Sequence, residues 1–154
     1  MVQNFLAWGE EYAVGHQELD AEHRQLVQTI NTICSAEHIE ASPEKLAPLL
    51  RALVLGAVEH FKHENEVMRD FSIIAMQSHP NAAAFMGTLS VAAINEHCSE
   101  HARALVALEL IIHNHASETK SAQGSVGKTI IDWFIEHSTE HDAGLRNVFQ
   151  TLKP

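Results

Sequence analysis

The stretch His60-Phe61-Lys62-His63-Glu64 sets an imidazole and a carboxylate four residues apart. Residues at positions i and i+4 lie on one face of an α-helix, so the side chains of His60 and Glu64 can point at a single ion. Three further stretches carry the same kinds of group, at residues 20–23, 97–101 and 137–142. Because each stretch falls in its own helical segment, the four together predict a metal site inside a four-helix bundle.

Apolar residues recur at intervals of three and four residues around these stretches, which is the pattern of helices with one buried face. The predicted helices cover residues 20–38, 43–76, 80–116 and 125–151. Asp20 suits the N-cap of the first helix, and Ser42 followed by Pro43 suits the start of the second. Residues 1–19 are expected to form an extended N-terminal arm.

The spacing of the four stretches indicates an antiparallel bundle. His23 and His60 are 37 residues apart, and His101 and His137 are 36 residues apart. At a rise of about 1.5 Å per residue, each segment travels about 22–24 Å away and returns to the same level. We therefore predict an all-α fold, an up-down-up-down four-helix bundle in which residues 1–154 form a single domain.

Composition restricts the partners and the location. The chain of 154 residues has a formal net charge of −10 and only 10 Lys and Arg residues, which argues against nucleic acid and anionic membranes as partners. The sequence shows no secretion signal and no run of about 18 apolar residues. Cys34 and Cys98 form no CxxC motif and are typical of buried small residues in a reducing compartment. These features predict a cytoplasmic location.

The predicted core faces carry a set of imidazoles and carboxylates that is costly to bury without a metal ion. Five imidazoles belong to it, those of His23, His60, His97, His101 and His137. With Glu64 and one more ligand from the last stretch, the set exceeds what one tetrahedral zinc ion takes, and it suits two ions that share bridging carboxylates. Imidazoles and carboxylates together suit iron, manganese or zinc.

Spacing alone leaves either Asp142 or His141 as the last ligand. His137 and His141 stand at i and i+4, whereas Asp142 lies about 140° around an ideal helix from His137. The apolar stripe runs through 126, 130, 133 and 137 and then through 142, 145, 149 and 152, a slip of one residue that predicts a π-bulge. A continuation through 141, 145, 148 and 152 also fits.

The remaining histidines are expected outside the cluster. His63 competes with Glu64 only weakly, because it lies about 100° from Glu64 around the helix and off the apolar stripe. Surface positions are expected for His16, His38, His79, His113 and His115.

Several short motifs together resemble bacterial hemerythrins. They are Trp8…Tyr12-Ala13-Val14-Gly15…Leu19-Asp20-Ala21-Glu22-His23, His60-Phe61-x-x-Glu64, His97-x-x-Glu100-His101, and Trp133-Phe134-x-x-His137 followed by Asp142. The resemblance covers nearly the whole chain. It implies two iron ions with an oxo or hydroxo bridge, and dioxygen as a reversible ligand.

The resemblance also implies a role for each residue. His97, His101 and His137 would hold one iron. His23 and His60 would hold the other, which would keep an open position for oxygen. Glu64 and Asp142 would bridge the two ions. The oxygen pocket would be lined by Leu26, Phe61, Trp133, Phe134 and Ser138.

Ser138 departs from the family pattern, because a branched aliphatic residue is usual at this position. Its hydroxyl would make the pocket wetter and speed autoxidation, or hydrogen-bond the bound ligand. The alternative is that the hydroxyl turns to the carbonyl four residues earlier in its own helix and does little.

A second departure is the separation of Glu64 and His97, which is 33 residues and about twice the family's usual length. It predicts an elongated hairpin between the second and third helices. The apolar residues of this extension are Met68, Phe71, Ile73, Ile74, Met76, Phe85, Met86 and Leu89. They would pack on the N-terminal arm and the end of the fourth helix, or form the surface of a dimer or partner complex.

The expected function is reversible dioxygen binding for oxygen sensing, storage or delivery. One alternative is a di-iron redox enzyme, either an oxidase or peroxidase or a scavenger of nitric oxide or peroxide. Another is a structural bundle that holds zinc. The apolar pocket and the shortage of spare acidic residues on the core stripes favour a binding protein over an enzyme. A monomer is expected, with a dimer through the elongated hairpin as the alternative.

Overall fold

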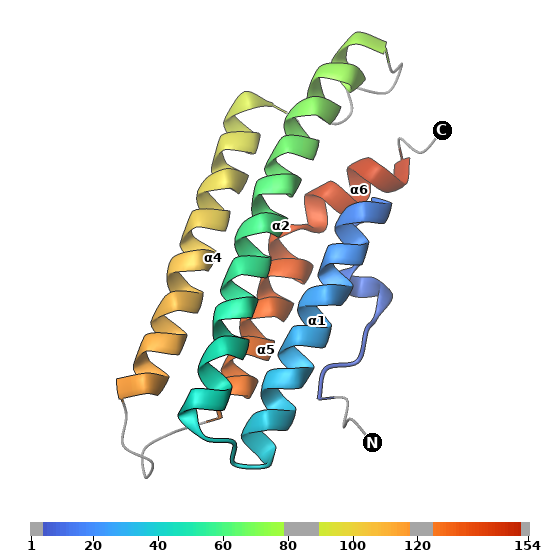
Figure 1. Ribbon diagram of the computed structural model, residues 1–154. Coiled ribbons are helices and arrows are strands. Elements are labelled where there is room, and N and C mark those ends of the chain that lie inside the picture. The colour runs from blue at the N-terminus through green and yellow to red at the C-terminus, as the bar shows by residue number, and fades with distance from the viewer. Residues whose placement is uncertain (1–4, 79–89, 118–124, 152–154) are drawn as a thin grey trace.

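The computed structural model of the chain describes residues 5–78, 90–117 and 125–151, and it is a bundle of helices (Figure 1). Four long segments lie side by side, namely α1 (Gln17–His38), α2 (Pro43–Ser78), α4 (Val91–Ser117) and α5 (Val126–Glu136). The colour gradient in Figure 1 runs in opposite directions along successive helices. The described ranges contain no strand, so the prediction of an all-α bundle is confirmed.

The first helix begins three residues earlier than predicted, at Gln17, with His16 as its N-cap. The prediction that Asp20 is the N-cap is therefore wrong. The Asp20 carboxylate instead accepts hydrogen bonds from the backbone N–H groups of Val14 (2.7 Å) and Gly15 (3.1 Å). Gly15 has a φ of 89°, a left-handed conformation that suits glycine, so Asp20 holds the turn by which the arm enters α1.

The other helix boundaries follow the predictions with two qualifications. α2 begins at Pro43 as predicted and continues to Ser78. α4 is described from Val91 to Ser117, and its predicted start at residue 80 lies outside the described residues. Within its described part before α1, residues 5–16, the N-terminal arm contains one turn of 3-10 helix, Glu10–Tyr12, and no other regular element.

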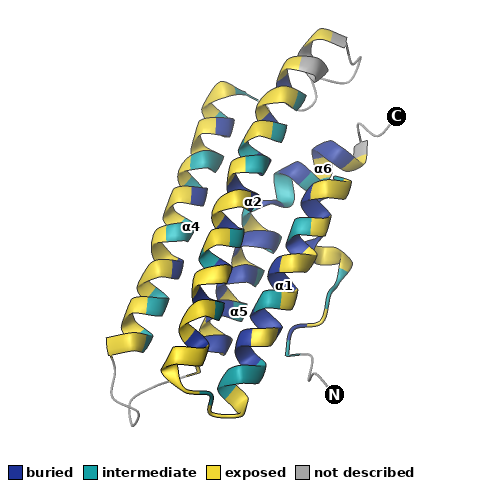
Figure 2. Cartoon of the chain, viewed as in Figure 1, coloured by how far each residue is buried: buried dark blue, intermediate teal, exposed yellow. Residues whose placement is uncertain are grey.

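Buried residues line the space between the four helices, as the dark blue segments of Figure 2 show. Each helix contributes a side chain with no exposed surface to one cluster: Ile30, Leu53, Leu108 and Ile130. Burying a side chain of this size stabilises the fold by roughly 1.5–3 kcal/mol. The helices are therefore held close enough for polar side chains on the same faces to meet.

The fourth predicted helix is broken into three parts, and this break confirms the predicted slip of one residue. α5 ends at Glu136, a π-helical turn (η3) covers His137–His141, and α6 covers Ala143–Thr151. The Asp142 N–H donates to the carbonyl of His137 five residues earlier (3.2 Å). The extra residue in this turn brings Asp142 onto the buried face, where it has no exposed surface.

The part of α2 beyond Glu64 packs on the arm and on α6. This agrees with the first of the two predictions for its apolar residues, which was packing within the chain rather than in a dimer. Met68 is buried in a second cluster with Val14, Leu19, Leu145 and Phe149. Phe71 is partly buried and meets Phe149 edge to face, with ring centroids 5.1 Å apart.

Ile73, in contrast, is 57% exposed. The side chains of Ile74, Met76, Phe85, Met86 and Leu89 lie outside the described residues. Among the described helices, none is both long enough and apolar enough to cross a membrane.

Candidate metal centre

The structure brings together the seven side chains that were predicted as metal ligands. Six of them are at most 2% exposed: His23, His60, Glu64, His101, His137 and Asp142. The side chain of His97 is 13% exposed, so this imidazole forms the outer wall of the group. Helices α1, α2 and α4 and the turn η3 all contribute, which explains why no local segment could form the site alone.

The carboxylate of Glu64 faces imidazoles on both of its oxygens. Oε1 lies 2.7 Å from Nε2 of His97 and 3.2 Å from Nε2 of His101. Oε2 lies 3.3 Å from Nε2 of His60. This arrangement is suited to a carboxylate that binds one ion through each oxygen.

The carboxylate of Asp142 likewise faces imidazoles with both of its oxygens. Its Oδ2 lies 3.2 Å from Nε2 of His137 and 3.5 Å from Nε2 of His23, and its Oδ1 lies 3.6 Å from Nε2 of His97. His141 points elsewhere, because its Nδ1 faces Oε2 of Glu100 at 3.7 Å and its side chain is 30% exposed. Of the two alternatives for the last ligand, the structure places Asp142 in the cluster.

These residues fit a metal ion because most of their inward atoms have no hydrogen-bond partner, the exceptions being Nε2 of His97 and Oε1 of Glu64, which bind each other. The unpaired atoms include Nε2 of four histidines, one oxygen of Glu64 and both oxygens of Asp142. Buried polar atoms are nearly always paired, since an unpaired one costs about 1–3 kcal/mol. Cations would remove that cost, and a set of imidazole nitrogens and carboxylate oxygens suits iron, manganese or zinc.

Two overlapping groups have ligand atoms within 4.8 Å of one another. One contains His23, His60, Glu64 and His137, and the other contains Glu64, His101, His137 and Asp142. His97 belongs to neither group, although it contacts Glu64. The presence of Glu64 in both groups agrees with a carboxylate shared by two ions.

Three of the imidazoles are oriented by hydrogen bonds on their outer nitrogens. Nδ1 of His23 donates to the backbone carbonyl of Tyr12 (2.7 Å). Nδ1 of His60 donates to Oε2 of Glu22 (2.8 Å), and Nδ1 of His101 donates to Oδ1 of Asn65 (2.8 Å). Because each acceptor is an oxygen, the proton must sit on Nδ1, and the lone pair of Nε2 is directed to the centre in the neutral ring.

Sequence reasoning missed Glu22 and Asn65. Glu22 also binds Nδ1 of His63 through Oε1 (2.6 Å), so one carboxylate joins a buried and a half-exposed imidazole. One feature of the sequence could have suggested that Glu22 pairs with His60 and His63. His63 lies beside the buried stripe of its helix, where a carboxylate of a neighbouring helix can reach it. Asn65 had none, since a single amide on a helix has many possible partners.

The protonation of His60 depends on these carboxylates. Burial by itself opposes the charged form, but the hydrogen bond to Glu22 and the carboxylate of Glu64 beside Nε2 outweigh it and raise the pKa of His60 to about 9. Burial likewise opposes ionisation of Glu22, yet its hydrogen bonds with His60 and His63 leave its pKa below the usual value. For His23 burial dominates, and together with the nearby His60 it lowers the pKa.

Apolar rings cover the inner side of the cluster. Phe61 stacks on His101 with ring centroids 4.3 Å apart, and Phe134 meets His23 edge to face at 5.9 Å. Trp133 is buried and donates its indole N–H to the carbonyl of Ala104 (2.8 Å). Leu26 is also buried, so these four of the residues predicted to line a ligand pocket are all shielded from solvent.

Ser138 has no exposed surface, and its hydroxyl donates to the carbonyl of Phe134 four residues earlier (2.9 Å). Of the three alternatives for Ser138, this bond agrees with the one in which the hydroxyl turns to its own helix and has little effect on the pocket. Its one O–H donor is therefore already used within the helix.

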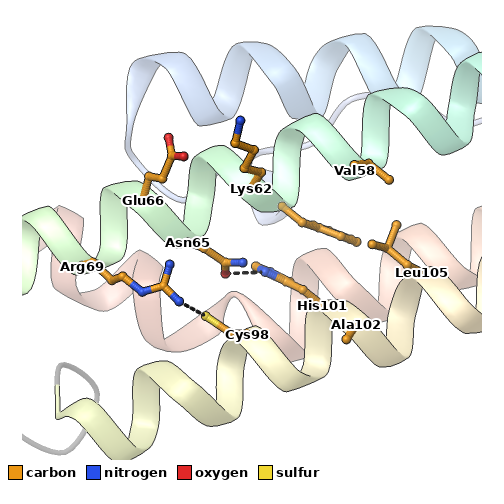
Figure 3. A pocket seen from close by; sticks show the side chains of 10 residues that line it. Val58, Lys62, Asn65, Glu66, Arg69, Cys98, His101, Ala102 and Leu105 are labelled. Atoms are coloured by element: carbon orange, nitrogen blue, oxygen red, sulfur yellow. Dashed lines mark hydrogen bonds between the residues drawn. The ribbon is translucent and has the colours of Figure 1, made fainter.

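A groove of about 290 Å³ lies between α2 and α4, and Asn65 and His101 are both among the residues that line it (Figure 3). Figure 3 shows the hydrogen bond between these two side chains and also the bond from Arg69 to the Cys98 sulfur (3.5 Å). The cluster therefore borders this groove through His101, which Asn65 holds by its Nδ1.

The fold and this cluster define a helical-bundle protein with the residues to hold metal cations. Comparison with known families then identifies it, because the model of the Hemerythrin HHE cation binding domain matches residues 14–146. The chain belongs to this family. Among curated proteins and among solved structures, none matches the chain.

Proposed function

We propose that this protein binds dioxygen reversibly at a centre of two iron ions. The observation that carries the proposal is the set of buried nitrogens and oxygens without hydrogen-bond partners, which four helical segments direct at one point. The membership of the hemerythrin family supports iron over other cations. When bound, two iron ions would supply the reversible two-electron chemistry that dioxygen binding requires.

We assign the ligands to the two ions as the family resemblance implies. His97, His101 and His137 would hold one ion, and His23 and His60 would hold the other, where a position would be left for oxygen. Glu64 and Asp142 would be shared by the two ions. The contacts of Glu64 with His60 through one oxygen and with His97 and His101 through the other support this division.

The chain's own residues then exclude water from the bound ligand. Phe61 and Phe134 pack against imidazoles of the cluster, and Trp133 and Leu26 are buried in the same hydrophobic core. The hydroxyl of Ser138 is held by Phe134 and offers no free proton to that space. A dry pocket without a spare acid favours release of unchanged oxygen over further reduction, which supports a binding protein rather than a redox enzyme.

We also propose a cytoplasmic location and a monomeric state for this protein. Oxygen sensing, storage or delivery in the cytoplasm agrees with two free cysteines, which are typical of a reducing compartment. We propose a monomer, because the extension of α2 already buries Met68 and part of Phe71 against the arm and α6.

The test is the visible spectrum of iron-loaded, anaerobically reduced protein, recorded before air, after air and after purging with argon. We expect an absorption band that develops with oxygen, vanishes on purging and returns in a second cycle. The Glu64→Ala variant is the control, since it lacks a bridging carboxylate. Immediate and irreversible oxidation would instead support the redox enzyme, and fewer than two irons per chain would show that the ligand assignment is wrong.

A further inference from the structure

Arg146 on α6 connects the N-terminal arm, which is far away in the sequence, with the neighbouring π-helical turn. Its backbone N–H donates to the carbonyl of Asp142 (3.1 Å). Its Nε donates to the carbonyl of Ala13 (2.7 Å), and its Nη2 donates to the carbonyls of Ser138 (3.2 Å) and Glu11. One side chain therefore binds the arm and the π-helical turn together.

On one side, Arg146 closes the turn that carries two candidate ligands. Ser138 directly follows His137, and Asp142 ends the turn. A π-turn shifts the backbone hydrogen-bond pattern, so its carbonyls need partners from elsewhere. The side chain of Arg146 binds the carbonyl near the start of the turn and its backbone binds the carbonyl at the end, which holds the turn at its wider spacing.

On the other side, Arg146 fixes the carbonyl that orients His23. The two arm carbonyls that it binds, those of Glu11 and Ala13, flank Tyr12. The Tyr12 carbonyl accepts the hydrogen bond from Nδ1 of His23. Asp20 secures the next two residues through the N–H groups of Val14 and Gly15, so the arm is held on both sides of the contact.

We propose that Arg146 is a positioning residue for the metal centre, and that it sets the relative placement of His23 and Asp142. Nε2 of His23 and Oδ2 of Asp142 lie 3.5 Å apart, and they come from opposite ends of the chain. A functional constellation has to be held within about 0.5 Å of its working geometry. The arm thus becomes part of the site, because it is the element through which Arg146 reaches His23.

Arginine is suited to this role because its planar guanidinium carries five N–H donors in a fixed fork. Lysine has a single nitrogen and can replace only part of the contacts. The inference rests on the proposed metal centre but not on its reaction with oxygen.

The experiment compares four variants with the wild type: Arg146→Met, Arg146→Lys, Asp20→Ala and, as control, Arg51→Met. Arg51 is exposed on α2. Each protein is titrated with Co²⁺ against a competing chelator, and the cobalt absorption spectrum is recorded at each equivalent. Circular dichroism and urea unfolding of the metal-free proteins report the fold separately.

We expect the wild type and Arg51→Met to take two Co²⁺ ions per chain with the same affinities. Arg146→Met should bind both ions more weakly, because Asp142 would be shared by them, with the larger loss, about 10- to 100-fold, at the ion that His23 would hold. Arg146→Lys should recover part of the affinity, and Asp20→Ala should weaken mainly the ion that His23 would hold. An unequal loss at the two ions with intact helicity distinguishes positioning from a general loss of stability.

Wild-type affinities in Arg146→Met, or equal weakening of both ions in Arg146→Lys, would overturn the inference. If Arg146→Met fails to fold, the Arg146→Lys and Asp20→Ala variants test the inference through the same comparison of the two Co²⁺ affinities. A wild type that binds two ions but no oxygen would overturn the proposed function and leave this inference standing.

Discussion

Oε2 of Glu22 lies 2.8 Å from Nδ1 of His60, across the interface between α1 and α2. The carboxylate holds the ring so that its other nitrogen faces the metal centre, and it increases the basicity of that nitrogen. Glu22 also binds His63, which keeps it in place from the solvent side. Three of the seven candidate ligands thus depend on outer contacts that come from α1, α2 and the arm.

Replacing Glu22 with Gln should weaken metal binding by about 10- to 100-fold. The amide can still accept a hydrogen bond from His60, but it lacks the negative charge. The measurement is competition for Co²⁺ with a chelator. Glu59→Gln is the control, because Glu59 is an exposed carboxylate on α2. Equal affinities in the two variants would show that the contact with His60 has no effect on the centre.

Metal binding should release protons near neutral pH and strengthen as the pH rises. In the metal-free protein the pKa of His60 is about 9, against 6.5 for an ordinary histidine. A raised pKa means that this group stabilises the metal-free fold fully below about pH 6.5 and that the contribution is lost as the pH rises through about 9. A metal ion has to displace the same proton, so its affinity increases over that range.

Calorimetric titration in buffers of different ionisation enthalpy measures this proton release. We expect release at pH 7.5 and less of it in Glu22→Gln, where the carboxylate that keeps His60 protonated is absent. Proton uptake on metal binding would contradict the assignment of His60.

Ser138→Ala should leave the autoxidation rate of the iron-loaded protein within about twofold of the wild type. The Ser138 hydroxyl is already bonded to the carbonyl of Phe134, so its removal takes no donor from the pocket. The stability should change by at most about 1 kcal/mol, the net contribution of one hydrogen bond. The decay of the oxygenated spectrum in air measures the rate, and a marked slowing would mean that the hydroxyl does reach the ligand.

Glu37→Gln should lower the free energy of unfolding by about 1–2 kcal/mol without changing the metal content. The Glu37 carboxylate on α1 accepts hydrogen bonds from the N–H groups of Val126 (2.8 Å) and Gly127 (3.1 Å) and from the hydroxyl of Ser125 (2.8 Å). It therefore caps the start of α5 from a neighbouring helix and places its charge near the positive end of the helix dipole. Urea unfolding measures the effect, with Glu109→Gln on the exposed face of α4 as control.

The pattern of residues along the chain was sufficient to predict the bundle and the meeting of its polar stretches. The apolar stripes around His23, His60, His101 and His137 have helical spacing, and hydrophobic burial of such stripes leaves little choice of arrangement. The slip of the stripe after His137 was also enough to predict the π-turn that the structure contains. These features are local or periodic, so each can be read from a single sequence.

Only the tertiary structure decided which atoms support the cluster. Helical spacing favoured His141 and the family pattern favoured Asp142 as the last ligand. In the structure the π-turn directs Asp142 inward and His141 to Glu100. Asp20 had the features of a helix cap, yet its carboxylate holds the arm instead. The Tyr12 carbonyl and the contacts of Arg146 have no sequence signature, because every residue has a backbone carbonyl and the packing of distant segments selects which one is used.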